Sequence, residues 1–537
     1  MIGNKEFISY LCFHDDTGIQ ISYRHTKFPR HTPERLYIYV DKTGYIRRLV
    51  KTGKYYFLSR PRRFGKSLLM STIEAYFKGS KELFEGLEIA AYEKEWKEYP
   101  VFHLDLSGEN YNDIPTLTKV LNYFLSEIEK NYGLSEDGHT VALRFKNAIK
   151  GVYDKTGRQV VILVDEYDTP LTQTLTSPEL QEEFRNMLKG FYGVMKSMDG
   201  YIKLAMLTGV TRFSKVSIFS DLNNLRDISF LPEYNAICGV AESEIVSYFT
   251  PAISSFADKR NIPISAMAEE LRRNYDGYRF ADPAECEGIY NPFSLLNALA
   301  SESIGDYWFE TGTPTFLVRL LQEKNYPLHR LNKTEASQDE LKGLDLAMAG
   351  IIPLMYQSGY LTIRDFDRQF GLYTLGFPNK EVERGFLNFL FPYYTSIRNG
   401  NGTFAIREFT RDISQGNVDS FMHRLQSLFA DFPYDQIREM ELHFHNVLYL
   451  VFTLMGYYTR TEYRSSHGQA DLIVKTDSRI FIFEFKLDKS PREAIEQIDR
   501  MGYALPFSSE GKEIIKIGVN FSSTLRNIDS WIVEKDE

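Results

Sequence analysis

The sequence predicts an α/β protein in which a mostly parallel sheet with covering helices precedes a second, smaller α/β domain. The first observation is that continuous apolar runs alternate with helical patterns, at residues 55–58, 101–106, 160–164 and 203–208. Strands that are apolar on both faces are typical of parallel sheets buried between helices. The second observation is that the order helix, strand, strand, helix, strand begins after about residue 426. That order indicates a second sheet with its own helices.

The length of the chain and the composition of its segments predict four parts. With 537 residues the chain is longer than one hydrophobic core usually supports. Residues 1–35 are polar and aperiodic and are predicted to be an extension, and residues 36–240 the parallel-sheet core. Residues 241–425, which are helical in pattern and rich in aromatic residues, are predicted to be a lid and connector. Residues 426–537 form the predicted second domain.

Composition and charge exclude several classes of protein. No run approaches the roughly 18 consecutive apolar residues of a membrane span, and the first residues lack the apolar core of a signal peptide. We therefore expect a cytoplasmic protein with no membrane partner. Cys12, Cys238 and Cys286 are too widely spaced for a disulfide framework or a zinc cluster. The net charge of −9 argues against a generally basic nucleic-acid binder.

Residues 60–67 lie between an apolar strand and a helical pattern, which is where a phosphate-binding loop belongs. They end in Gly-Lys-Ser, the last three positions of the pattern G-x-x-x-x-G-K-[ST], whereas Arg60 stands where that pattern has its first glycine. Backbone N–H groups and the helix N-terminus would wrap the phosphates of ATP, Lys66 would reach the outer phosphates, and Ser67 would bind Mg²⁺. The predicted ATP-binding residues of the loop are Arg63, Phe64, Gly65, Lys66, Ser67 and Leu68.

Positive charge is concentrated just before this loop and within it. From Lys42 to Lys66 there are nine Lys or Arg residues and no Asp or Glu. A solvated basic face is the ordinary interpretation of such a run. Because the run ends inside the candidate loop, with Arg60, Arg62 and Arg63 in the loop itself, we favour the interpretation that it attracts phosphate groups.

Two further predicted strands end in polar residues at the same edge of the sheet. The run 160–164 is followed by Asp165, predicted to hold Mg²⁺, and by Glu166, predicted to orient and polarise the attacking water. The next run ends at Thr208, which would contact the γ-phosphate or the water. Arg212 comes four residues later. It is interpreted either as an arginine finger, which neutralises the charge of the transferred phosphoryl group, or as an ordinary surface arginine, and the sequence leaves both interpretations open.

Acidic and basic residues lie on one face of two predicted strands in the second domain. Asp471 lies on the first strand, and Glu484 and Lys486 share a face of the next because side chains repeat every second residue. The spacing Asp-x(12)-Glu-x-Lys gathers two carboxylates around a divalent metal, with a lysine that stabilises charge on a reacting phosphate or helps to activate water. On an exposed strand Glu-x-Lys is often a salt pair. Here the flank 480–483 is apolar, and burial of the pair indicates a site.

Four motifs resemble those of the bacterial AAA-ATPase-like family, which is distant from typical AAA+ proteins. They are residues 39–43, 60–67, 164–168 and 208–214. The resemblance extends over most of the chain and implies that an arginine at the first loop position is usual in the family. It also implies nucleotide binding, without showing that ATP is hydrolysed.

The C-terminal motif resembles that of the PD-(D/E)XK nuclease superfamily, whose fold is like that of restriction endonucleases. The resemblance implies that Gln497, on the helix after the second strand, supports the active Lys486. It also implies that Glu441, on the leading helix, completes the metal site of Asp471 and Glu484. His445 and His467 are interpreted as a helix-surface and a loop residue, and are given no role.

These observations leave two main hypotheses for function. In the first, the state of bound ATP regulates a Mg²⁺-dependent nuclease-like domain that acts on DNA or RNA, with Glu166, Asp471, Glu484, Lys486 and Gln497 as catalytic residues. In the second, the chain is a nucleotide-binding switch or scaffold whose inactive nuclease-like domain recognises a protein partner. Residues 431–537 carry 13 Lys or Arg and 18 Asp or Glu, which favours the second. A homo-oligomeric ATPase that acts on protein is a third alternative.

Overall fold

The computed structural model describes most of the chain, and that part divides into two compact units. The described residues are 19–20, 36–136, 140–174, 177–212, 219, 222, 224–309, 315–342, 350–395, 397, 402–430, 440–456, 458–465 and 468–535. The first unit comprises residues 1–310 and 333–382, and the second comprises residues 311–332 and 383–537. Most of the predicted extension lies outside the described residues, apart from β1 (Ile19–Gln20), which pairs with β2 (Leu36–Tyr37).

The first unit is built on a five-stranded, all-parallel sheet with the strand order β4-β5-β6-β3-β7. The strands are β3 (Tyr55–Ser59), β4 (Val101–Asp105), β5 (Val160–Asp165), β6 (Ile202–Gly209) and β7 (Arg226–Asp227). Strands β3 and β5 are buried over their whole length, as expected for strands that are covered on both faces. The predicted parallel α/β fold class is therefore confirmed. Because β6 lies between β3 and β5, the carboxyl ends of these three strands are neighbours.

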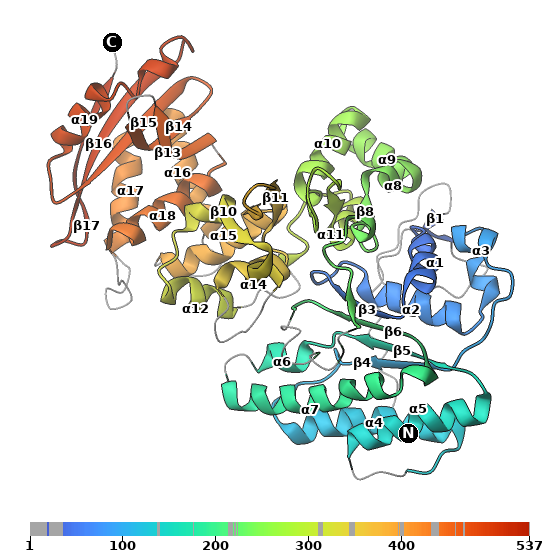
Figure 1. Ribbon diagram of the computed structural model, residues 1–537. Helices are drawn as coiled ribbons and strands as arrows, with labels where there is room; N and C mark the ends of the chain where they lie inside the picture. Colours follow the sequence, from blue (N-terminus) through green and yellow to red (C-terminus); the bar gives the residue numbers. More distant parts are fainter. Residues whose placement is uncertain are drawn as a thin grey trace. The chain divides into compact units, whose positions relative to one another are not determined.

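Helices cover both faces of this sheet (Figure 1). On one face α4 (Ile114–Tyr132), α5 (Val141–Thr156) and α7 (Pro178–Ser197) share a hydrophobic core with the strands. On the other face lie α1 (Thr43–Thr52), α2 (Lys66–Phe77) and α3 (Glu88–Tyr92). The ends of α4 follow from the sequence, because the Asp113 carboxylate caps its first turn and Gly133 ends it in the left-handed conformation. The short α6 (Thr169–Gln173) follows β5.

The rest of the first unit combines a helical cluster with two small sheets. The cluster consists of α8 (Glu242–Glu244), a π-helical turn (Ile245–Phe249), α9 (Thr250–Arg260), α10 (Ile264–Tyr275) and α11 (Pro292–Ser301), and it has a core of its own. The paired strands β8 (Val240–Ala241) and β9 (Ile289–Tyr290) lie beside it. A three-stranded antiparallel sheet follows, with β10 (Thr334–Ser337), β11 (Thr362–Asp367) and β12 (Leu372–Gly376), and with helices α13 (Gln338–Lys342) and α14 (Ile351–Gln357). The segment for which the sequence indicated helices therefore contains strands as well.

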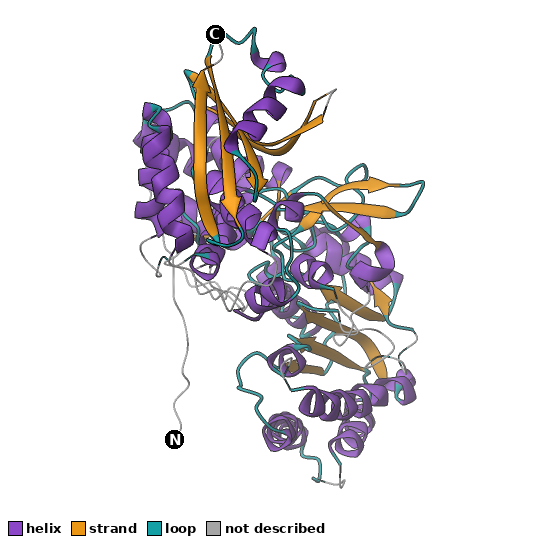
Figure 2. Cartoon of the chain, turned by 90° about the vertical axis from the view of Figure 1, so that its left-hand side faces the viewer, coloured by secondary structure: helices purple, strands orange, loops and turns teal. Residues whose placement is uncertain are grey.

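The second unit holds a smaller mixed sheet with the order β13-β14-β15-β16-β17 (Figure 2). Its strands are β13 (Tyr458–Ser465), β14 (Gly468–Lys475), β15 (Arg479–Leu487), β16 (Glu513–Ser522) and β17 (Asn527–Lys535). Only β15 and β16 pair in parallel, and α19 (Pro491–Arg500) connects them. This helix packs so closely on β16 that a Cβ atom at Gly518 would lie 2.2 Å from the Pro491 carbonyl oxygen. The predicted second α/β domain is confirmed, with two strands more than the sequence indicated.

The two faces of β15 differ, and the difference follows from strand alternation. Ile480 and Ile482 pack in a core with α19, and Glu484 and Lys486 continue the same alternating set. Phe483 lies on the opposite face against aromatic rings of α17 (Val418–Ala430) and α18 (Met440–Leu454). The other helices that include residues of this unit are α12 (Thr315–Glu323), α15 (Lys380–Tyr394) and α16 (Gly402–Gln415). No helix in the described parts of the chain is long and apolar enough to cross a membrane.

Candidate nucleotide site and candidate metal site

The phosphate-loop residues connect β3 to α2, and α2 begins at Lys66. Gly65 precedes the helix in the left-handed region with φ 92°, where glycine avoids the strain that a side chain would impose. Arg63 also has a positive φ, 66°, and adopts it without that freedom. Lys66, Ser67 and Leu68 are therefore the first residues of a helix, whose N–H groups have no partner within the helix. This is the backbone arrangement that the sequence predicted for phosphate binding.

Lys66 is buried, and three oxygen atoms surround its ammonium group. Its Nζ donates hydrogen bonds to the carbonyl oxygens of Arg60 at 3.2 Å and Pro61 at 3.3 Å. Glu166 Oε1 lies 3.1 Å from the same Nζ, in an ion pair. Glu166 is also in the left-handed region, with φ 51°, at the turn that follows β5. The structure thus brings Lys66 of the loop together with Glu166, which follows the end of β5.

Asp165 and Thr208 meet between the ends of β5 and β6. The register pairs Val164 with Leu207. The residues that follow them, Asp165 and Thr208, therefore lie side by side. Thr208 Oγ1 donates a hydrogen bond to Asp165 Oδ1, and the same oxygen accepts the Glu166 N–H at 3.1 Å. Both side chains are buried. Four residues predicted from separate segments, Lys66, Asp165, Glu166 and Thr208, therefore lie at one edge of the sheet.

Asp168 is a residue of this site to which sequence reasoning gave no role. Its buried carboxylate accepts hydrogen bonds from the backbone N–H groups of Val210 and Thr211 and from the Thr211 hydroxyl. Burial, with the nearby charge of Glu166, raises the pKa of Asp168 to about 6. Asp168 therefore ties the turn after β5 to the segment that follows β6. Its place at the end of the motif 164–168 was the available signal.

Arg212 is buried, with 4% of its surface exposed, so the interpretation as an ordinary surface arginine is wrong. Its guanidinium forms an ion pair with Asp227 and lies 4.4 Å from the centre of the Phe230 ring. Its backbone N–H donates to Gln357 Oε1 at 2.8 Å. The role as an arginine finger stays a prediction, and it requires the pair with Asp227 to open.

In the second unit, β14, β15 and α19 bring four predicted residues together. Asp471 Oδ2 accepts the backbone N–H of Phe485 at 2.8 Å, which fixes it beside β15. Lys486 Nζ donates to Glu484 Oε1 at 2.8 Å and to Gln497 Oε1 at 2.7 Å. Two acceptors from different elements therefore set the direction of the Lys486 ammonium.

Glu484 is a buried carboxylate, with 1% of its surface exposed, and only one of its oxygens has a hydrogen-bond partner. Burial is the main cause that raises the pKa of Glu484 to about 7, the charge of Asp471 adds to it, and Lys486 opposes it. Burial likewise raises the pKa of Asp471. A buried and a partly buried carboxylate, both with raised pKa values, and an unpartnered oxygen on Glu484 are a donor set that a divalent cation would satisfy.

The described residues contain no group of three or more His, Cys, Asp and Glu side chains arranged to hold a metal by themselves. Mg²⁺ does not require one, because it is commonly held by one or two carboxylates, water and substrate phosphates. Asp471 and Glu484 fit a site of that kind. Glu441 is exposed at the start of α18, and its charge also raises the pKa of Asp471. Its role as a further ligand stays a prediction.

His445 also affects the pKa of Asp471, although the sequence predicted only a helix-surface residue. Its charge lowers the pKa of Asp471, against the effect of burial. The signal in the sequence was its spacing, because His445 lies four residues after Glu441 and therefore on the same side of α18. His467 lies outside the described residues.

Two segments of the chain match models of known families. Residues 28–219 match the family model described as predicted AAA-ATPase, and residues 439–531 match that of the PD-(D/E)XK nuclease superfamily. A protein of Azotobacter chroococcum mcd 1, described as an uncharacterized protein in the vnfD 5′ region, is 34% identical over 512 residues. That similarity covers 93% of this chain and 95% of the relative. The chain belongs to the AAA-ATPase-like family.

The family matches cover the residues of both candidate sites. In this AAA-ATPase-like chain the first match includes the loop, the ends of β5 and β6, and Arg212. The nuclease-superfamily match includes Asp471, Glu484, Lys486 and Gln497, together with Glu441. Proteins of these two families generally use a nucleotide and a divalent metal, which is the chemistry that the two donor sets suit.

Proposed function

We propose that the chain binds MgATP at the carboxyl edge of its parallel sheet, and that the nucleotide state regulates a metal-dependent phosphodiesterase site in the second unit. The observation that carries the proposal is the presence of one charged, partly buried cluster in each unit, each assembled from neighbouring strands. Lys66 with Asp165 and Glu166 forms the first cluster, and Asp471 with Glu484 and Lys486 forms the second. DNA or RNA is the proposed substrate of the second cluster.

In the first cluster, ATP binding and the activation of water are coupled through Lys66. Its ammonium already has three oxygen partners, so a phosphate oxygen must replace one of them. Glu166 is the easiest to replace, because its side chain is 21% exposed whereas the other two partners are backbone carbonyls. Once released, Glu166 is available to accept a proton from the attacking water. Ser67 and Asp165 would hold Mg²⁺, which supplies neutralising charge to the phosphates.

In the second cluster, Asp471 and Glu484 would hold a divalent cation, which supplies Lewis-acid stabilisation of a phosphoryl oxygen. Lys486 stabilises the negative charge that develops on the reacting phosphate. Gln497 is a positioning residue, because its amide oxygen accepts from the Lys486 ammonium at 2.7 Å and holds it in direction. The charge on Lys486 is therefore oriented before the substrate arrives.

Regulation of one unit by the other has support in the path of the chain. The polypeptide passes between the two units three times, at residues 310–311, 332–333 and 382–383. A change in the first unit can therefore act on the second through several covalent connections. The proposal requires the nuclease-like activity to differ between the ATP-bound and the nucleotide-free protein.

A second candidate function is a nucleotide-binding switch whose nuclease-like domain recognises a partner without cleaving nucleic acid. The observation that favours it is the charge of residues 431–537, where 13 basic and 18 acidic residues leave a net charge of −5. Such a surface repels the phosphate backbone, so the second unit has little affinity of its own for nucleic acid. A protein partner, or a second copy of the chain, would then be the ligand.

The experiment measures ATP binding and nuclease activity on the full chain. Isothermal titration should show MgATP binding to the wild type and none to Lys66→Ala. Labelled single-stranded and double-stranded DNA and RNA, incubated with Mg²⁺ with and without ATP, should be cleaved by the wild type and not by Glu484→Ala. Glu496→Ala, on the exposed side of α19, is the matched control and should cleave normally.

The outcomes separate the two candidate functions. If the wild type cleaves none of these nucleic acids in either nucleotide state, the nuclease hypothesis is wrong and the switch hypothesis stands. If Lys66→Ala binds no nucleotide yet keeps full binding of a partner isolated with the wild type, the switch is not driven by nucleotide.

A further inference from the structure

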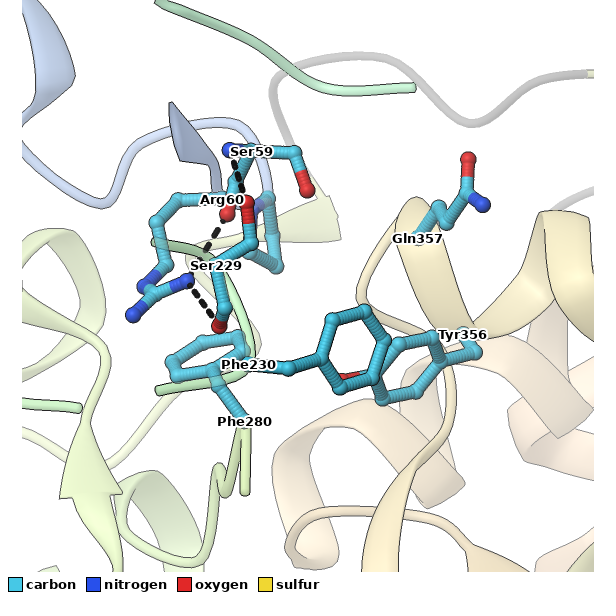
Figure 3. Close-up of a pocket in the computed structure, with 8 residues that line it drawn as sticks. Ser59, Arg60, Ser229, Phe230, Phe280, Tyr356 and Gln357 are labelled. Carbon is cyan, nitrogen blue, oxygen red and sulfur yellow. Dashed lines mark hydrogen bonds between the residues drawn. The ribbon is translucent and has the colours of Figure 1, made fainter. Parts of the chain in front are cut away.

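Arg60 occupies the first position of the phosphate loop, and its side chain is buried inside the first unit, with 1% of its surface exposed. Nη1 of its guanidinium donates to the carbonyl oxygens of Ser59 at 2.9 Å and Ser229 at 3.0 Å. Nη2 donates to the Tyr234 carbonyl oxygen at 2.9 Å. Figure 3 shows Arg60 beside Ser229, with the Phe280 ring next to them. One side chain thus links the start of the loop to two points of the segment 229–234.

The charged Arg60 guanidinium is held by groups other than a carboxylate. Among the ion pairs of the described residues none involves Arg60, whereas its Cζ atom lies 3.9 Å from the centre of the Phe280 ring. Backbone carbonyls and an aromatic face hold a guanidinium well, because its planar fork directs several N–H groups at once. Burial lowers the pKa of Arg60 to about 10, so the group stays charged at neutral pH.

Phe64, four residues further along the same loop, packs against neighbouring segments and is hydrogen-bonded to them. Its buried ring packs edge-on against Tyr278 and Phe280, with ring centres 4.8 and 5.6 Å apart. Its carbonyl oxygen accepts the backbone N–H of Gly239 at 3.0 Å. Arg60 and Phe64 therefore meet the same aromatic side chain, Phe280, from the two ends of the loop.

The backbone of Arg60 takes part in the candidate nucleotide site, while its side chain does not reach it. Its N–H donates to the Gly209 carbonyl oxygen at 3.1 Å, and its carbonyl oxygen accepts from Lys66 Nζ at 3.2 Å. The loop residues with positive φ are Arg63 and Gly65, so the backbone at position 60 does not require a glycine. The arginine at this position is thus compatible with the loop conformation and adds four side-chain hydrogen bonds.

We propose that Arg60 is a positioning residue of the nucleotide site, which holds the phosphate loop against the segment 229–239 and Phe280. A glycine has no side chain and is unable to form this connection. The inference rests on the proposed nucleotide site and adds to it that the loop conformation depends on the segment 229–235 and on the Phe280 ring. Movement of the segment 229–239 would then change ATP affinity directly, because the Arg60 carbonyl also holds Lys66.

The variant Arg60→Gly tests the proposal sharply, because it restores the common pattern G-x-x-x-x-G-K-S. If Arg60 merely fills a glycine position, this variant binds MgATP as well as the wild type or better. If Arg60 positions the loop, its MgATP affinity falls at least about tenfold, the equivalent of one charge-assisted hydrogen bond. Arg60→Lys keeps the charge without the fork and should fall between the two. Arg273→Ala, an exposed arginine of α10, is the control and should bind normally.

A second measurement does not depend on nucleotide. Hydrogen–deuterium exchange of the peptide that covers residues 60–69 is followed in nucleotide-free wild type and variants. Arg60→Gly should raise exchange in this peptide at least about tenfold, with exchange in β5 unchanged, because only the loop has lost its support. If Arg60→Gly does not fold, Arg60→Lys is compared in the same way.

The two measurements give distinguishable failures. Unchanged exchange of the loop peptide in the Arg60 variants overturns the positioning role, whatever the nucleotide does. Equal or tighter MgATP binding by Arg60→Gly also overturns it. If the wild type itself binds no MgATP, the proposed nucleotide function is wrong, and the exchange measurement still decides whether Arg60 supports the loop.

Discussion

Replacing Glu484 by Gln removes a buried carboxylate and keeps its shape, which predicts a pH-dependent gain in stability. In the folded unit, burial and the Asp471 charge raise the pKa of Glu484 from its ordinary value of 4.5 to about 7. Below about pH 4 the side chain is protonated in both the folded and the unfolded chain, so it costs nothing. As the pH rises from about 4.5 to 7, the unfolded chain releases the proton first, and the wild type loses stability. Above about pH 7 the loss is complete.

The size of the effect follows from this shift of the pKa. A difference of about 2.5 pKa units corresponds to about 3 kcal/mol of free energy of unfolding above pH 7. The Lys486 ammonium, 2.8 Å from Glu484 Oε1, opposes the rise of the pKa, so its favourable interaction is already contained in this figure, and it keeps its charge when it donates to the Gln oxygen instead. We therefore expect Glu484→Gln to stabilise the second unit by about 3 kcal/mol at pH 8. At pH 5 the gain should fall below about 1 kcal/mol, because the folded side chain is still protonated there.

The assay is urea unfolding at pH 5 and pH 8, with hydrogen exchange of β15 peptides as a readout of the second unit. Glu496→Gln, on the exposed side of α19, is the control and should leave both values unchanged. Added Mg²⁺ at pH 8 should stabilise the wild type and not Glu484→Gln, because a ligand stabilises only the state that binds it. An equal effect of the substitution at pH 5 and pH 8, or no gain at pH 8, would refute the interpretation of Glu484 as a destabilising buried charge.

Three further substitutions test other parts of the chain. Glu166→Gln removes the negative charge paired with Lys66, so MgATP affinity should rise about tenfold. ATP hydrolysis, measured by phosphate release, should be lost. Unchanged affinity would contradict the idea that Glu166 and a phosphate oxygen compete for Lys66. Asp168→Ala leaves the backbone N–H groups of Val210 and Thr211 and the Thr211 hydroxyl without their buried acceptor, so thermal unfolding of the first unit should show a loss of about 2–4 kcal/mol. Gly277→Ala would place a Cβ 2.1 Å from a backbone carbonyl oxygen at φ 103°, and should cost at least about 2 kcal/mol in the same measurement. Gly190→Ala, in α7 with no atom within 4 Å of the added Cβ, is its control and should gain about 0.5–1 kcal/mol.

The central strands of both sheets and the edge strand β4 were predictable from the sequence, whereas the edge strands β7, β13 and β17 were not. Strands β3 and β5 are apolar throughout because helices cover both their faces, and such runs are easily recognised. Strand β7 is only two residues long, Arg226–Asp227, and has no apolar signal. Strands β13 and β17 lie at the edges of the second sheet, and their sequences are mostly polar or mixed, without the continuous apolar run of a central strand.

The candidate sites were predictable where a residue stands at the end of a buried strand. Asp165 and Thr208 were identified in this way, and Lys66 was identified from the Gly-Lys-Ser pattern. The structure brings the three residues to one edge because parallel strands end on the same side. Asp168 was missed, since its role depends on the N–H groups of a segment more than 40 residues later in the chain. The burial of Arg212 was missed for a similar reason, because Asp227 and the ring of Phe230 that enclose it carry no pattern that links them to Arg212.

The sequence by itself determined the two α/β domains and the charged residues at their strand ends, because burial and strand alternation leave a local pattern that can be recognised in the chain. Only the tertiary structure decided what Arg60 does. In the sequence it is a departure from a glycine pattern, while in the fold it donates to carbonyl oxygens of Ser229 and Tyr234, 169 and 174 residues away. Backbone carbonyls occur at every residue, so no sequence pattern identifies which of them a distant side chain will meet.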